Sequence, residues 1–195
     1  MQCHRNCQVD MCPMRHITCR MLTPDRIVVL GCSGAGKSTL AAQLAKQWDL
    51  PFFPTDEVYW RSDWTPVPET EVRAWLDATT ASTRWVLDGN FDAQRDLLWS
   101  RAQLAVWLDL SWATTVLSVS HRNLRWWMSG EDIWGGARMT FAKAVSGIAH
   151  TAKSHALKRR AYPDLLAAFP DLTVVRIRSR RELARWKARL APRAE

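Results

Sequence analysis

Short apolar runs rich in β-branched residues alternate along this chain with segments whose apolar residues recur at helical spacing. The runs predict buried strands, and the periodic segments predict amphipathic helices. The predicted strands cover residues 26–30, 51–54, 85–87, 104–110 and 173–177. The predicted helices cover residues 37–48, about 72–79, 92–101, 112–128 and 142–168, with Pro163 interrupting the last of these, and a final helix face at Leu183, Trp186 and Leu190.

Strands that alternate with helices favour a parallel sheet covered on both faces. Residues 55–68, which contain Pro66 and Pro68, are expected to form a loop, and the glycines within 129–136 break the helical pattern. The sequence shows no internal repeat and no long linker. The expected organisation is a leader over residues 1–22 followed by one domain over residues 23–192.

The 195 residues are 47% hydrophobic, enough for a buried core, and carry a net charge of +8. Residues 1–150 hold 15 basic and 15 acidic side chains, whereas residues 151–195 hold 12 and 4. A basic face of this kind attracts phosphates on nucleotides, nucleic acids or lipids, although an arginine-rich helix can also simply be solvated. No apolar run approaches the ~20 residues that span a bilayer, and residues 1–21 lack the apolar stretch of a secretory signal. A cytoplasmic protein without a membrane segment is therefore expected.

Residues 31–39 read GCSGAGKST and match the pattern G-x-x-x-x-G-K-[ST] at every required position. Glycines let the backbone fold around phosphates, and the following helix adds the positive end of its dipole. A lysine in this pattern reaches the terminal phosphates, and the next hydroxyl binds the magnesium ion that bridges them. The motif predicts a site for ATP or GTP with Mg²⁺, formed by Gly31, Ser33, Gly34, Ala35, Gly36, Lys37, Ser38 and Thr39.

Carboxylates follow several predicted strands, where the ligands of parallel sheets gather. Asp88 ends the run Trp85–Leu87 and is expected to hold magnesium together with Ser38. Asp56 follows the second strand and is expected to contact either magnesium or the phosphoryl acceptor. For Asp109, a helix N-cap or surface role is expected.

Arginines stabilise the charge of a transferring phosphoryl group. Arg122 is the first candidate for this role and Arg125 the second, because both precede a glycine-containing segment where a lid could hinge. Arg95 is a candidate for the acceptor side. Trp60 and Trp64 either stack on a planar acceptor or pack their loop onto the body of the domain. Five other tryptophans fall on apolar faces and are expected in the core: Trp48, Trp75, Trp85, Trp107 and Trp186.

Four of the five cysteines fall within the first 19 residues, at Cys3, Cys7, Cys12 and Cys19. Zinc is one interpretation, but the paired spacing of zinc ligands is not present. The other interpretation is a disordered leader, with Met21 as an alternative start.

The P-loop occurs with further motifs that together resemble one family, in the order FPTDEVYWRSDWTPVP, WVLDGNF, AVWLDL, HRNLRWW and IWGG. From about residue 26 to about residue 186 the chain resembles the DNA topology modulation protein family, which belongs to the adenylate kinase-related P-loop proteins. The resemblance implies an α/β three-layer fold with a parallel five-stranded sheet, helices on both faces and a small lid. The chain departs from the family pattern at residues 134–137, where Trp-Gly-Gly-Ala replaces Trp-Asn-Gly-Asn.

The same resemblance implies a kinase-like nucleotide site at Lys37, Ser38, Thr39 and Asp88. It also implies that Arg122 and Arg125 are lid arginines and that Asp56, Trp60 and Arg95 face the acceptor.

Two functions follow as hypotheses. The first is a kinase that transfers the γ-phosphoryl group of ATP to a small acceptor such as a nucleotide or nucleoside. The second is a nucleotide-dependent regulator that binds DNA or RNA through the basic C-terminal region. The sequence leaves open the acceptor, the choice between ATP and GTP, and the oligomeric state.

Overall fold

The computed structural model describes residues 24–61, 63–133 and 136–190. At its centre lies a five-stranded sheet in which every pairing is parallel, with the strand order β2-β3-β1-β4-β7. The strands are β1 (Arg26–Gly31), β2 (Phe52–Pro54), β3 (Trp85–Asp88), β4 (Leu104–Leu108) and β7 (Thr173–Ile177).

The central strand β1 shows why these runs are continuously apolar rather than alternating. In register it places Val28 between Leu87 of β3 and Ala105 of β4. Residues 27–30 are completely buried because helices cover both faces of the sheet, so successive side chains all need an apolar surface. The predicted parallel sheet is confirmed.

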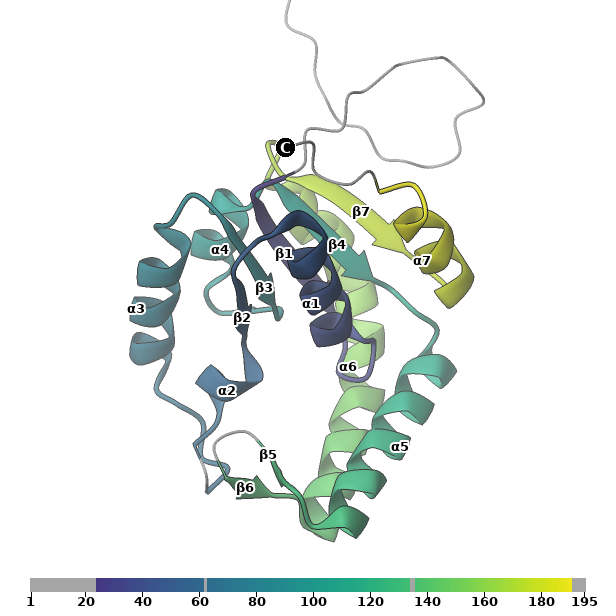
Figure 1. Cartoon of the computed structure of the whole chain (residues 1–195). Helices are drawn as coiled ribbons and strands as arrows, with labels where there is room; N and C mark the ends of the chain where they lie inside the picture. The colour runs from purple at the N-terminus through teal and green to yellow at the C-terminus, as the bar shows by residue number, and fades with distance from the viewer. Residues whose placement is uncertain (1–23, 62, 134–135, 191–195) are drawn as a thin grey trace, which may run out of the picture.

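Helices form the two outer layers (Figure 1). On one face, the core joins the sheet to α1 and α7, and on the other it joins the sheet to α3, α4 and the C-terminal part of α6. This is the expected three-layer α/β fold. The helices longer than a single turn are α1 (Lys37–Trp48), α3 (Glu69–Thr80), α4 (Arg95–Arg101), α5 (Trp112–Ser129), α6 (Phe141–Ala167) and α7 (Arg180–Lys187).

Helix α5 runs away from the sheet to a small antiparallel hairpin, and α6 begins just after this hairpin and runs back beside α5 (Figure 1). The hairpin consists of β5 (Asp132–Ile133) and β6 (Ala137–Arg138). Its apolar residues form a separate small core with Met139 and Ala144, against which Trp64 and Trp126 pack. This unit stands where a small lid was expected. Its two-residue strands are too short for any pattern to reveal.

Two predicted elements differ from the structure near the second and third strands. The expected loop 55–68 begins with a helical turn, α2 (Asp56–Tyr59), because the Thr55 carbonyl accepts hydrogen bonds from two later amides. Helix α4 begins at Arg95 rather than Asp92, after Phe91 adopts a left-handed φ of 45°.

Helix α6 continues through Pro163 instead of being interrupted by it. A proline inside a helix removes one hydrogen bond and disfavours the helix by about 3 kcal/mol. Tyr162 and Leu166 are buried on either side of Pro163 against the sheet core. This packing holds both halves of the helix in place. It involves strands that are distant in the sequence, so it could not be predicted from the residues around Pro163.

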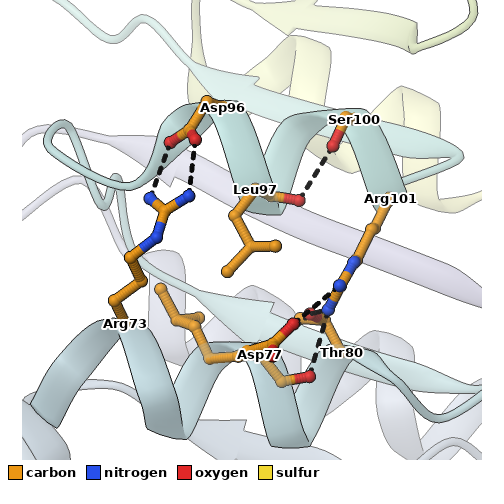
Figure 2. Close-up of polar contacts among 8 residues, drawn as sticks. Arg73, Asp77, Thr80, Asp96, Leu97, Ser100 and Arg101 are labelled. Atoms are coloured by element: carbon orange, nitrogen blue, oxygen red, sulfur yellow. Dashed lines mark hydrogen bonds and ion pairs between the residues drawn. The ribbon is translucent and has the colours of Figure 1, made fainter. Parts of the chain in front are cut away.

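Helices α3 and α4 are fastened together by arginine–carboxylate pairs (Figure 2). Arg73 donates to both carboxylate oxygens of Asp96, at 3.2 and 2.8 Å. Arg101 pairs with Asp77 at 2.7 Å and also donates to the Thr80 hydroxyl at 2.8 Å. These pairs hold α3 and α4 in place relative to each other.

Of the helices that the structure describes, none is long and apolar enough to cross a membrane. The N-terminal cysteines and the expected leader lie outside the described residues. So do Trp134 and Gly135, where the sequence departs from the family pattern.

Candidate nucleotide-binding site

The glycine-rich loop connects the end of β1 to the start of α1. Gly34 and Gly36 have φ values of 80° and 93°, in the left-handed region that glycine adopts without strain. Helix α1 begins after Gly36 without a side-chain cap. The N–H groups of its first turn are therefore left for an outside acceptor, and Ser38 and Thr39 in that turn are exposed. An uncapped, exposed helix start of this kind suits an anion.

The two left-handed glycines have different surroundings. A Cβ at Gly34 would lie 2.7 Å from the Thr115 carbonyl oxygen and 2.9 Å from the Val119 nitrogen, both in the backbone of α5. A Cβ at Gly36 would meet nothing within 4 Å. Gly34 therefore lets the loop pack against α5, whereas Gly36 borders open space.

Lys37 reaches back across the loop, where its Nζ donates to the Cys32 carbonyl at 3.3 Å. Burial lowers the pKa of Lys37, and Asp56 and Asp88 oppose this shift. Arg122 and Lys158 act in the same direction as burial because they are also positive. The structure thus brings three cationic and two anionic side chains together at the loop.

Asp88 and Asn90 connect three segments at the end of β3. The buried Asp88 carboxylate accepts a hydrogen bond from the amide of Thr55, between β2 and α2, at 2.8 Å. The Asn90 side chain accepts from the Gly31 amide at 2.9 Å, at the start of the glycine-rich loop. Asn90 was not among the predicted site residues, although the unbroken Asp-Gly-Asn sequence after a strand was a signal for it.

Asp56 is the first residue of α2 and faces the glycine-rich loop. Burial raises its pKa, while Lys37 and Arg122 counteract the increase. A carboxylate with a raised pKa next to the glycine-rich loop is suited to accept a proton from a hydroxyl group.

Of the two candidate lid arginines, the structure brings only Arg122 to the loop. Its Nη2 donates to the Ser33 hydroxyl at 3.0 Å, and its guanidinium lies 4.7 Å from the centre of the Trp126 ring. The Arg125 side chain is 68% exposed and lies 4.0 Å from Glu131. Residues three apart share one side of a helix, but Arg125 lies almost one turn further along α5 from Thr115 and Val119, which the glycine-rich loop approaches.

The acceptor-side candidates lie in two places. Trp60 is half-buried, with its ring 5.9 Å from that of Trp64. Trp64 donates from its indole nitrogen to the Arg138 carbonyl at 2.9 Å, so this part of the loop contacts the hairpin, while Tyr59 and Val67 at its two ends pack against the core of the sheet. Arg95 lies at the start of α4 and donates to the main-chain carbonyl of Asp92 at 2.7 Å.

A polar cluster that the sequence analysis did not assign to the site lies between α6 and the segment after β3. Asp92 binds Lys158 Nζ at 2.6 Å and the Tyr162 hydroxyl at 2.8 Å. Lys158 influences the pKa of both Cys32 and Lys37, so it lies near the glycine-rich loop. Sequence alone placed Lys158 with the basic C-terminal residues, because nothing local shows that α6 crosses over this site.

The expectation for Asp109 is wrong in both of its forms. Its side chain is 3% exposed, and one oxygen accepts from Arg176 Nε and Nη2 at 2.9 and 2.6 Å. Arg159 approaches the other oxygen at 3.6 Å. The N-cap of α5 is instead Ser111, whose hydroxyl accepts from the Thr114 amide. Asp109 therefore joins β4 to β7 and α6.

The oxygen ligands near the loop fit magnesium. Ser38 offers an exposed hydroxyl and Asp88 a carboxylate, both hard oxygen donors. Among the described residues, no group of three or more His, Cys, Asp or Glu side chains could hold a metal without other ligands. Mg²⁺ is usually bound by one or two protein ligands together with nucleotide phosphates, so Ser38 and Asp88 would supply the ligands expected from the protein.

No family model matches the chain. An uncharacterized protein, YqaC of Bacillus subtilis (strain 168), is 30% identical over 119 residues, which is 60% of this chain and 66% of that protein. The alignment thus covers slightly less than two thirds of the relative, whose name states no activity.

A gluconokinase from Sinorhizobium meliloti 1021 resembles the structure at 22% sequence identity with a TM-score of 0.40. The match covers 71% of this chain and 98% of that one. At this level the likeness carries no argument about function. The resemblance to the topology modulation family stays a prediction.

Proposed function

We propose that this protein is a kinase that binds ATP with Mg²⁺ and transfers the γ-phosphoryl group to a hydroxyl of a small acceptor. The observation that carries the proposal is the convergence of Lys37, Arg122, Asp56 and Asp88 on an uncapped, glycine-rich helix start. Phosphoryl transfer depends mainly on positioning and on charge stabilisation, and this arrangement supplies both.

In the proposed reaction, the phosphates of ATP lie against the amides of residues 34–39. Lys37 leaves the Cys32 carbonyl to contact the terminal phosphates, and Arg122 approaches from α5. Ser38 and Asp88 would hold magnesium, which neutralises charge on the β- and γ-phosphates. The nucleotide site includes the remaining predicted residues of the loop, Gly31, Ser33, Ala35 and Thr39.

The acceptor hydroxyl is placed on the Asp56 side of the loop. Its oxygen forms the new bond to the γ-phosphorus, and the bond from that phosphorus to the bridging oxygen of ADP breaks. The hydroxyl proton passes to the Asp56 carboxylate, and the products are ADP and the phosphorylated acceptor. We propose Trp60 and Arg95 as neighbours of the acceptor, and Arg125 as a lid residue that is not in contact with the loop in this structure.

The proposal is tested by measuring ADP production from ATP with Mg²⁺ across a panel of nucleosides, sugars and nucleoside monophosphates. At least one acceptor should raise turnover, and Lys37→Ala should remove the increase. The loss corresponds to about 3–4 kcal/mol, the effect of deleting one strong electrostatic donor. Lys46→Ala, on the exposed side of the same helix, is the matched control and should retain activity. Turnover that persists in Lys37→Ala would refute the proposed site.

A second function keeps some support from exposed basic residues in the C-terminal part of the chain. Arg160, Arg181, Arg185 and Arg189 are all exposed to solvent. A regulator that binds DNA or RNA through this surface should lose affinity steeply with added salt and should still bind after Lys37→Ala. Salt-sensitive gel shifts without acceptor-stimulated turnover would favour this function over the kinase.

A further inference from the structure

We infer that the phosphoryl acceptor is a hydroxyl compound that carries no phosphate or carboxylate group. The inference rests on the proposed kinase function and narrows its substrate class. It follows from the charges and rings of residues 55–101, which run from the second strand to the end of α4 and contain the acceptor-side candidates.

This acceptor segment has the opposite charge from the rest of the protein. Residues 55–101 contain nine acidic and five basic side chains, all five of them arginines, in a chain whose net charge is +8. A site that captures an anionic acceptor needs unsatisfied cations, since a phosphate or carboxylate is bound by arginine forks or by lysine. An arginine of this segment could bind an anionic acceptor only if its guanidinium were not already paired with a carboxylate.

Four of the five arginines are already paired with carboxylates. In Figure 2, Arg73 and Arg101 both point at carboxylates of the facing helix rather than outward. The hydrogen bond from Arg73 holds the pKa of Asp96 below its ordinary value, so this pair is ionised at neutral pH. The four pairings are Arg61 with Glu71, Arg73 with Asp96, Arg84 with Asp25 and Asp49, and Arg101 with Asp77.

The fifth arginine, Arg95, lies next to the cluster around Asp92. Its guanidinium donates to the Asp92 carbonyl, while the Asp92 carboxylate neutralises Lys158, which α6 contributes from outside the segment. Lys158 is only 21% exposed and is also near the Tyr162 hydroxyl. Its charge is therefore directed into the protein rather than toward an acceptor.

The groups that remain for an acceptor are carboxylate oxygens and aromatic rings. Asp56 faces the glycine-rich loop, and Tyr59 lies with its ring 5.6 Å from that of Phe91. The carboxyl groups of Asp92 and Glu69 are close enough to Tyr59 to raise its pKa, although burial is the larger cause. Carboxylates accept hydrogen bonds from hydroxyl groups, and aromatic rings pack against the apolar faces of sugars and nucleosides. An anion placed here would meet like charges and the triphosphate of ATP.

The test offers the full-length protein ATP with Mg²⁺ and acceptors in matched pairs: nucleosides with their 5′-monophosphates, and hexoses, alditols and amino sugars with their phosphate or carboxylate derivatives. Products are identified by mass spectrometry, and kcat/KM is measured for each pair. The member without the anionic group should be preferred at least about tenfold, because one misplaced charge near a partly buried site has this order of effect.

An equal or better reaction of the anionic member would overturn the inference and leave the kinase function intact. Absence of product from every pair, with ATP binding retained, would instead refute the kinase function and the inference with it. The two failures are therefore distinguishable.

A charge variant tests the physical basis. Asp92→Asn removes the carboxylate that neutralises Lys158, so it should raise kcat/KM for the anionic members relative to the neutral ones by about tenfold. Asp171→Asn removes an exposed carboxylate between α6 and β7, outside residues 55–101, and is the matched control, which should leave this ratio unchanged. An unchanged ratio in folded Asp92→Asn would contradict the assignment of selectivity to this cluster.

Discussion

Gly34 and Gly36 offer a sharp test of the loop geometry, because they share a left-handed backbone but differ in what surrounds them. Alanine at either position pays about 1–2 kcal/mol for the left-handed conformation. At Gly36 the added methyl group enters open space, so no further loss is expected. At Gly34 it comes within 2.9 Å of two backbone atoms of α5. Forcing this helix aside adds about 1–3 kcal/mol.

Urea denaturation of the nucleotide-free protein measures this difference. Gly34→Ala should lower the free energy of unfolding by about 2–5 kcal/mol in total, and Gly36→Ala by about 1–2 kcal/mol. Gly36→Ala should nevertheless lose ATP affinity, since its methyl group projects where we propose the phosphates to lie. Equal destabilisation by the two variants, or a larger loss for Gly36→Ala, would refute the packing of the loop against α5.

Three further outcomes are expected. Lys37→Met should raise the melting temperature of the free protein at pH 7, because the lowered pKa of Lys37 means that its charged form destabilises the fold. This gain should vanish as the pH rises to 10.5, the ordinary pKa of lysine, and a gain that persists above it would contradict the reasoning. Arg122→Ala should reduce kcat by about 10²–10³, whereas Arg125→Ala should change it less than about tenfold, as measured by steady-state ADP release. Trp64→Phe removes the hydrogen bond to the Arg138 carbonyl and should destabilise the protein by about 1 kcal/mol in urea, while a neutral effect would show that the loop–hairpin contact is unimportant.

The strands and most helices could be predicted from the sequence because their signal is local. Residues 27–30 are apolar at every position, and a strand covered on both faces of a sheet buries all four of them. The core tryptophans follow the same logic: Trp48, Trp85 and Trp107 are buried as expected, while Trp75 and Trp186 are partly buried. Trp99, which is completely buried, was missed because its helix is only seven residues long and shows little periodicity.

Local signals failed where packing between distant segments decided the outcome. Pro163 lies within α6 because the residues around it pack onto the sheet. Asp109 is buried where arginines from α6 and β7, about 50 and 67 residues further along the chain, pair with it. No pattern near Asp109 carries that information.

For the candidate site, the glycine-rich loop motif and the carboxylates that end neighbouring strands could be predicted from the sequence alone. Both are recognised from the types and spacing of residues along the chain. The tertiary structure alone decided which other side chains face that loop. It placed Arg122 on the loop and Arg125 away from it, although both lie on one helix. It also brought Lys158 and Asp92 together, because α6 passes over the segment that follows β3. The neighbours of these two residues along the chain do not reveal that contact.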